Sequence, residues 1–167
     1  ELYFTAGAYK ADAARSAAWN RGAYLVEGLG HCSDCHSPRN LLGGIEKNKD
    51  FNGAVVDGWF ALDLTSDIAT GLGSWSVDDI ATYLKTGAYP GRTTTFGPMA
   101  EVVQNSTSFL TDDDRKAMAE YLNRTGALIV ILTLIFLAII LSTQFSFGRF
   151  FGAIIEALRA GATRTVD

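Results

Sequence analysis

The stretch Cys32-Ser33-Asp34-Cys35-His36 decides how this chain of 167 residues is interpreted. Its C-x-x-C-H spacing allows two thiols to add to the two vinyl groups of one haem, while the adjoining histidine binds the iron. These are the only two cysteines in the sequence, so neither would remain for a disulfide. We therefore predict one covalently bound haem c, attached to Cys32 and Cys35 with His36 as an iron ligand.

Two other kinds of site use cysteines at this spacing. A redox-active dithiol is expected within alternating strands and helices, and no strand-rich pattern surrounds this stretch. A zinc site needs four ligands that converge as a tetrahedron. The good nitrogen and sulfur ligands, His31, Cys32, Cys35 and His36, lie within six consecutive residues, which is too cramped for one ion. His31 adjoins an attachment cysteine, so we expect a loop or packing residue and not a second ligand.

Charge separates two parts of the chain. Residues 1–126 carry 11 Lys and Arg against 16 Asp and Glu, a net charge of −5, whereas residues 127–167 carry a net charge of +1. The acidic part has no basic stripe that could neutralise phosphates, so the sequence does not indicate nucleic-acid binding. Such a surface could instead steer a basic protein partner.

The C-terminal part is strongly apolar. Residues 127–141 are interrupted only by Thr133, and residues 127–147 carry no charge. This is the length of a membrane-spanning helix, although a buried helix is the alternative. Arginines follow this segment and Asp112 to Asp114 precede it. Because positive charge tends to stay on the cytoplasmic side, this predicts a haem domain on the periplasmic side of a bacterial inner membrane.

We predict an N-terminal extension (1–15), a cytochrome domain (16–126), a transmembrane helix (127–147) and an amphipathic tail (148–167).

Three amphipathic helices are predicted in the acidic part. The first covers 16–29, and Gly22 within it implies close packing against another helix. The second begins at Ser76, where Asp79 completes a capping box, and Gly87 ends it. The third begins at Thr111. Between the first two lies an irregular region with turn signals, in which Trp59 either faces a haem edge or fills the core.

A methionine sulfur on the second side of the iron would close it and raise its reduction potential. The chain offers only Met99 and Met118. Met118 falls on the apolar face of the third helix and is expected to pack in the core. Met99 follows Gly97 and Pro98 in a predicted loop that could approach the ring closely. We therefore predict Met99 as the second ligand, which suits electron transfer better than substrate binding.

Several separated motifs resemble one family. They are Trp19-Asn20-Arg21-Gly22-Ala23-Tyr24-Leu25-Val26, Gly30-His31-Cys32, Cys35-His36-Ser37-Pro38-Arg39-Asn40, Gly71-Leu72-Gly73-Ser74-Trp75-Ser76 and Gly97-Pro98-Met99-Ala100. Between about residues 6 and 123 the chain resembles a class I c-type cytochrome, and most closely the last haem domain of the cytochrome c subunits of bacterial membrane-bound alcohol, sugar and gluconate dehydrogenases. The resemblance implies an all-α fold of three to four helices around the haem, here followed by the C-terminal hydrophobic helix.

The resemblance also implies roles for particular residues. Arg39 would lie near a haem propionate, with a solvated surface arginine as an equal alternative, and Gly22 would pack against the last helix around Tyr121. Two departures stand out. The relatives usually carry three haems where this chain has one motif, and many have Pro-Asn at the position of Leu62-Asp63.

These observations together predict a non-enzymatic, monohaem, single-electron carrier of a bacterial respiratory chain. It would accept electrons from a membrane-bound dehydrogenase and pass them to quinone or another cytochrome. One alternative is a haem-based sensor or small haem enzyme with a vacated sixth iron position. Another is a metal or thiol protein without haem.

Overall fold

The computed structural model describes residues 7–89, 91, 93–123, 135–140, 142 and 155. The chain divides into two compact units, residues 1–125 and 126–167. In the second unit, residues 135–140 form a helix. The predicted tail at 148–167, apart from residue 155, and most of the segment 127–147 lie outside the described residues.

The predicted location of the chain needs a correction. None of the helices that the structure describes is long and apolar enough to cross a membrane. The prediction of an anchor formed by a C-terminal hydrophobic helix is therefore wrong.

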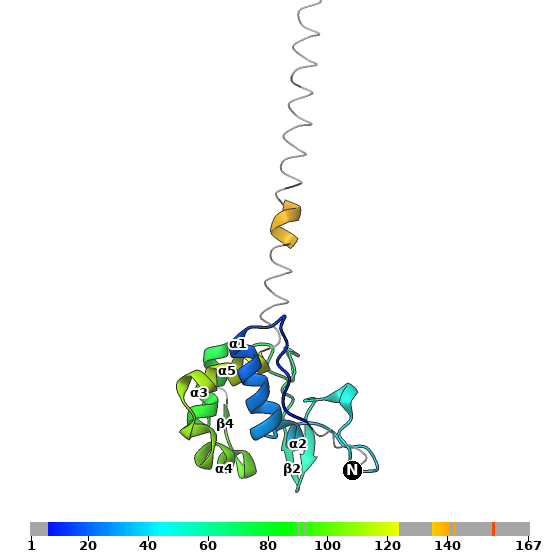
Figure 1. The fold of residues 1–167 in the computed structure, drawn as a ribbon, viewed down its shortest axis with the longest axis vertical. Coiled ribbons are helices and arrows are strands. Elements are labelled where there is room, and N and C mark those ends of the chain that lie inside the picture. The colour runs from blue at the N-terminus through cyan, green and yellow to red at the C-terminus, as the bar shows by residue number, and fades with distance from the viewer. Residues whose placement is uncertain are drawn as a thin grey trace, which may run out of the picture. The chain divides into compact units, whose positions relative to one another are not determined.

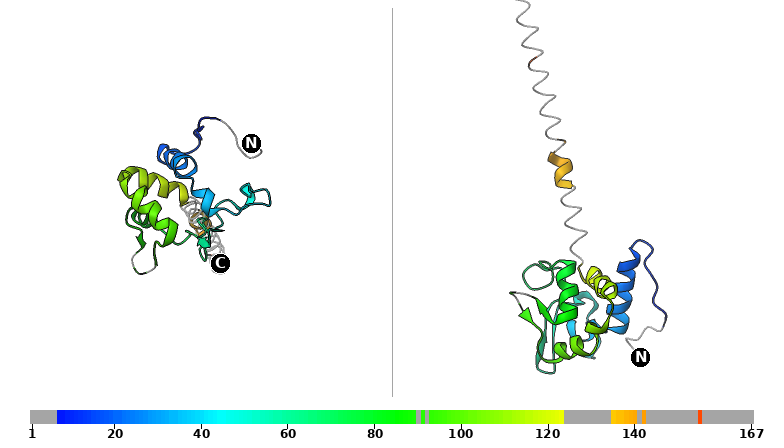
Figure 2. Two further views of the ribbon diagram at one scale, coloured as in Figure 1. Left: turned by 90° about the horizontal axis from the view of Figure 1, so that it is seen from below. Right: turned by 90° about the vertical axis from the view of Figure 1, so that its left-hand side faces the viewer.

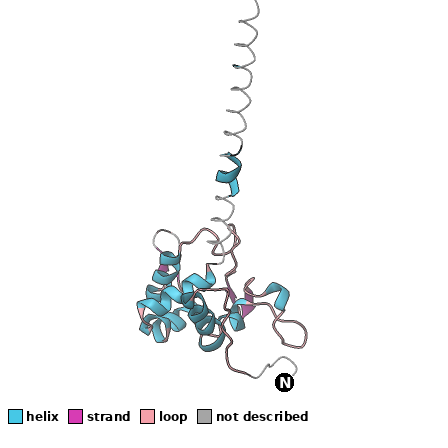
Figure 3. Ribbon diagram, turned by 45° about the horizontal axis from the view of Figure 1, so that its top comes forward, coloured by secondary structure: helices cyan, strands magenta, loops and turns pink. Residues whose placement is uncertain are grey.

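Helices dominate the first unit, and its strands are short (Figures 1 and 3). The helical elements are α1 (Ala17–Ala23), the π-helical η1 (Tyr24–Leu29), α2 (Cys32–His36), the 3-10 turn η2 (Lys47–Lys49), α3 (Val77–Thr86), α4 (Gly97–Asn105), the 3-10 turn η3 (Thr107–Phe109) and α5 (Asp112–Leu122). The strands β1 (Ala54–Val56) and β2 (Trp59–Ala61) form one antiparallel pair, and β3 (Ala88–Tyr89) and β4 (Thr93–Thr94) form another.

The core lies where α5 packs against α1 on one side and α3 on the other (Figure 2). Gly22 permits the first of these contacts, because a Cβ there would lie 1.9 Å from the carbonyl oxygen of Ala117 and 2.9 Å from Cβ of Tyr121. The expected packing of Gly22 on the last helix is therefore confirmed. Trp19 meets the Tyr121 ring edge to face, with centroids 5.0 Å apart.

The predicted helix starts are also confirmed. The Ser76 hydroxyl accepts a hydrogen bond from the Asp79 amide at 3.1 Å, and the Asp79 carboxylate accepts one from the Ser76 amide at 2.9 Å. Thr111 caps α5 through the Asp114 amide at 3.1 Å. Gly87 ends α3 with φ of 72°, a left-handed conformation that favours glycine.

The region that was predicted to be irregular contains a hairpin. Asp57 and Gly58 have φ of 49° and 81°, the two positive values of the two-residue turn that matches the twist of paired strands. Val56 pairs with Trp59 across this turn. The hairpin lies next to α2 in the fold (Figure 1), and it therefore reaches the C-x-x-C-H turn.

Candidate haem-attachment site

The C-x-x-C-H residues form the single-turn helix α2. It starts after His31, whose φ of 48° is left-handed and turns the chain sharply into the helix. Residues three apart share a helix face, so the turn presents Cys32 and Cys35 together. Both thiols are free, with Cys32 half-buried and Cys35 exposed. Two unpaired thiols on one face are the arrangement that attachment to a single haem requires.

His36 is fixed by the segment that contains the hairpin. Its ring Nδ1 lies 2.7 Å from the carbonyl oxygen of Leu62. A carbonyl can only accept, so Nδ1 carries the proton and Nε2 keeps its lone pair for a metal. The amide of Gly53 donates to the His36 carbonyl at 2.8 Å. Burial lowers the pKa of His36, although the bond to Leu62 opposes this, and the neutral form is the one that binds iron.

The surroundings of the two thiols disfavour the other two kinds of site. Burial raises the pKa of Cys32 to about 11, so its thiol stays protonated at neutral pH, unlike the low-pKa thiols of redox-active dithiols. Among the described residues, no group of three or more His, Cys, Asp or Glu side chains is placed to hold a metal ion. The donor set therefore fits a covalently attached haem better than zinc or dithiol chemistry.

A buried polar link ties α2 to the hairpin. The Ser37 hydroxyl donates to the Asp50 carboxylate at 2.7 Å and accepts from the amide of Phe51 at 2.8 Å. Ser37 and Phe51 are each 1% exposed. Phe51 has φ of 63°, an uncommon conformation for a bulky residue, and its carbonyl accepts from the Leu64 amide at 2.8 Å. These contacts fix the two ends of the segment that holds His36.

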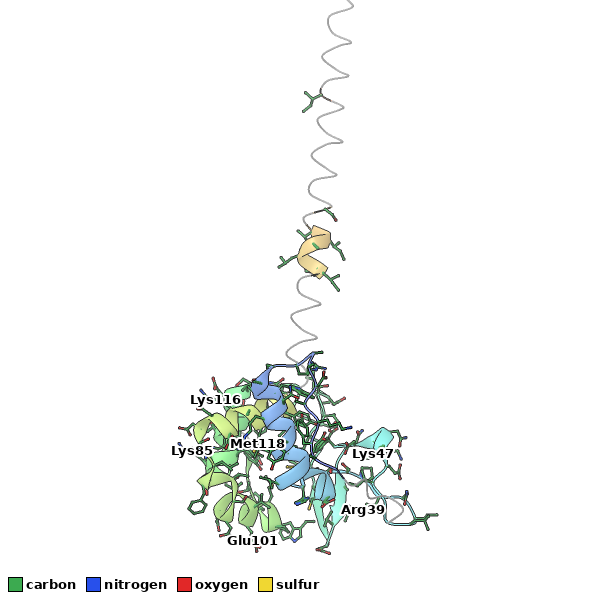
Figure 4. All side chains as sticks on the ribbon, in the orientation of Figure 1. Arg39, Lys47, Lys85, Glu101, Lys116 and Met118 are labelled. Carbon is green, nitrogen blue, oxygen red and sulfur yellow. The ribbon has the colours of Figure 1, made fainter. Side chains whose placement is uncertain are left out.

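Met99 lies on a helix and not in the predicted loop. It is the third residue of α4, which starts at Gly97 with Pro98 in its first turn. Proline suits this position because the first amides of a helix have no partner within it. Met99 is partly buried and packs against the core. Met118 is 2% exposed within α5, so its predicted place in the core is confirmed (Figure 4).

Arg39 lies on the loop that follows α2 (Figure 4). Its guanidinium donates to the Gly43 carbonyl at 2.8 Å and to the Asp34 carbonyl at 3.2 Å, and it lies 3.3 Å from the Asp34 carboxylate. The Arg39 side chain is 46% exposed. It therefore links the loop to α2 in addition to any role toward a bound group.

Apolar side chains project from the hairpin and from the start of α4. Trp59, Phe60 and Leu62 are 52%, 65% and 53% exposed, and Phe96 is 70% exposed. Exposed apolar groups can mark a binding surface, and a porphyrin ring is apolar over most of its area. Because Trp59 is 52% exposed, the second of its two predicted roles, that of a core aromatic, is excluded.

Two contributors to the site were missed by sequence reasoning. The Leu62 carbonyl is a backbone group, so no side chain marked it. The second contributor is the packing of Trp59 on Gly97, two residues that lie far apart in sequence. A Cβ at Gly97 would lie 2.7 Å from Cδ2 and Cε2 of the indole. A glycine two residues before a candidate ligand was the only signal that could have drawn attention to this contact.

Comparison with known proteins identifies relatives of the chain. No family model matches it. It is 44% identical over 118 residues to a subunit of the nicotinate dehydrogenase of Pseudomonas putida, covering 70% of this chain and 10% of that protein. It is 41% identical over 109 residues to the fructose dehydrogenase cytochrome subunit of Gluconobacter japonicus, covering 65% and 22%. It is 45% identical over 114 residues to the alcohol dehydrogenase (quinone) cytochrome c subunit of Gluconobacter oxydans, covering 64% and 24%.

The helical fold and the C-x-x-C-H turn agree with those expected of a c-type cytochrome domain, and the relatives include cytochrome subunits. More particularly, the chain is homologous to a cytochrome c domain of the cytochrome subunits of alcohol, fructose and gluconate dehydrogenases, as predicted. The chain spans about a tenth to a third of the length of these relatives. Three of these relatives are named as cytochrome subunits of dehydrogenases, which agrees with the prediction of a non-enzymatic domain.

Proposed function

We propose that the chain carries single electrons through one haem c, which is bound covalently by Cys32 and Cys35 and ligated by His36 and Met99. The observation that carries this proposal is the 2.7 Å contact between Nδ1 of His36 and the Leu62 carbonyl. That contact leaves Nε2 of the ring available as a ligand, beside two free thiols on one helical turn. When bound, the haem iron supplies reversible one-electron chemistry.

The surrounding residues hold the ligands and exclude water. Met99 would supply the sulfur ligand from the first turn of α4. An iron that is closed by this ligand would disfavour the binding of small molecules. Exposed apolar groups of the hairpin would cover the ring and present a partly open edge to redox partners. Arg39 would place a charge near a propionate while it stays bonded to Gly43 and Asp34.

The partners follow from the relatives' names. We propose that the donor is the catalytic part of a dehydrogenase, because three relatives are named as cytochrome subunits of fructose, gluconate and alcohol dehydrogenases. The acceptor would be quinone or another cytochrome of a respiratory chain. One relative is named as a dihaem cytochrome, and the single C-x-x-C-H motif here supports one haem for this chain.

Substitution of Met99 tests the proposed ligand set. In Met99→Ala the weak far-red absorption of a sulfur–iron(III) bond is expected to disappear, and the reduction potential to fall, because the thioether stabilises the reduced iron. Val102→Ala, a change at a half-exposed position of the same helix, is the control and should leave both unchanged. Persistence of the band in Met99→Ala would refute this assignment. Fast carbon monoxide binding by the reduced wild-type protein would favour the sensor alternative instead.

A further inference from the structure

The start of α4 has no side-chain cap and is held by packing, including the packing of Met99 on the core. Phe96, which precedes the helix, forms no side-chain capping hydrogen bond, and it is 70% exposed. The single buried residue of α4 is Val103, in its second half. A helix start without a cap loses about 1 kcal/mol of stability. The first turn, which carries Met99, therefore depends on what packs against it.

A further contact to this turn comes from Trp59. A Cβ at Gly97 would lie 2.7 Å from Cδ2 and Cε2 of the indole and 2.9 Å from Cε3. The ring system of Trp59 thus lies directly against the backbone of the residue that opens α4. Gly97 also has φ of 53°, so both its conformation and the indole require a residue without a side chain.

The same short segment also holds His36. Trp59 begins β2, and Leu62, whose carbonyl binds Nδ1 of His36, follows three residues later. The hairpin turn fixes Trp59 opposite Val56, and the Gly53 amide binds the His36 carbonyl at the other end of the hairpin. One segment, residues 53–62, therefore contacts both elements that carry candidate iron ligands.

We propose that Trp59 is a positioning residue: its indole packs on Gly97 and thereby keeps the first turn of α4, and with it Met99, in place for iron ligation. This inference rests on the proposed function. Loss of the indole would leave the attachment of the haem and the ligand His36 intact. It would raise the fraction of molecules in which the Met99 sulfur is detached from the iron.

The rate of carbon monoxide binding to the reduced, haem-loaded full chain measures that fraction, because the sulfur must leave before the gas can bind. Trp59→Ala is expected to raise this rate at least about tenfold and to lower the pH at which the oxidised protein loses its far-red band. Phe109→Ala is the control, since Phe109 is an exposed aromatic of η3 that has no part in the proposed site, and it should leave both values at those of the wild type. Trp59→Phe, which keeps a smaller ring, should give an intermediate rate.

The outcomes separate this inference from the function on which it rests. If Met99→Ala loses the far-red band while Trp59→Ala binds carbon monoxide at the wild-type rate, the role of Trp59 is overturned and the ligand set stands. If Met99→Ala keeps the band, the ligand set itself is wrong. If Trp59→Ala does not accumulate with haem, the rate of carbon monoxide binding by Trp59→Phe is the test. A wild-type rate in Trp59→Phe would then overturn the proposal.

Discussion

Gly22 shows how a single position joins the two helices at the centre of the domain. The carbonyl of Ala117 on α5 occupies the space into which any side chain at Gly22 would project. The sequence predicted this packing, because a glycine within a helix costs about 1 kcal/mol and needs a compensating reason. The 2.7 Å bond between His36 and Leu62 was not predictable in the same way, since a backbone carbonyl leaves no mark on the sequence.

Gly22→Ala tests the contact at this scale. The added methyl group would lie 1.9 Å from the Ala117 carbonyl oxygen, so α1 and α5 must separate, and we expect a loss of roughly 1–3 kcal/mol in the free energy of unfolding. Gly28→Ala is the control, because its added Cβ would approach no heavy atom of the surroundings more closely than 3.9 Å. Chemical denaturation of both variants measures the effect. Equal stability of the two would contradict the packing argument.

The helices differ in how clearly they could be predicted from the sequence. Those beginning at Ser76 and Thr111 carry capping residues and an apolar stripe, and both were predicted. The helix α4 was missed, because Gly97 and Pro98 were taken as a turn, although proline also suits the first turn of a helix. The strands of the hairpin are three residues long, so Asp57-Gly58 was recognisable as a turn while the strands were not.

The ion pair between α1 and α5 gives stability a pH dependence. Arg21 binds Asp114 through two hydrogen bonds of 2.7 and 3.0 Å. The bond to Arg21 lowers the pKa of Asp114 below its ordinary 3.8. This contribution is therefore present at pH values above 3.8 and is lost as the pH falls through the lower pKa of the folded state.

We expect Asp114→Asn to reduce the free energy of unfolding at neutral pH by less than about 1 kcal/mol, since the pair is partly exposed. We also expect the variant to lose less stability than the wild type as the pH drops below 3.8. Denaturant titrations at several pH values measure both effects. Asp113→Asn, at an exposed neighbour in the same turn, serves as the control. A wild-type pH dependence in Asp114→Asn would show that the pair contributes nothing.

On the scale of the whole molecule, the residues assigned to the haem all lie in the first unit, residues 1–125. The ligands, the hairpin and the helices that position them belong to that unit. The change in charge and hydropathy along the sequence predicts a domain boundary near residue 126. The prediction of a membrane anchor beyond it was wrong, since none of the helices that the structure describes could span a membrane.

A chain that ends after residue 125 tests whether the first unit suffices. We expect it to acquire haem and to keep the absorption spectrum and reduction potential of the full chain, because every residue named in the site lies within it. Spectroscopy and a redox titration of the two proteins side by side provide the measurement. A lost far-red band or a large change in potential would show that residues 126–167 help to form the site.

The central claim is that Cys32 and Cys35 hold a haem covalently. The most direct measurement is the mass and visible colour of the purified, denatured and acid-acetone-extracted polypeptide, expressed in a host that attaches haem c. The account predicts a chain that stays red and is heavier by one haem, and a Cys32→Ala/Cys35→Ala variant that is colourless after extraction. A wild-type chain that loses all its colour and shows the mass of the bare polypeptide would contradict the account.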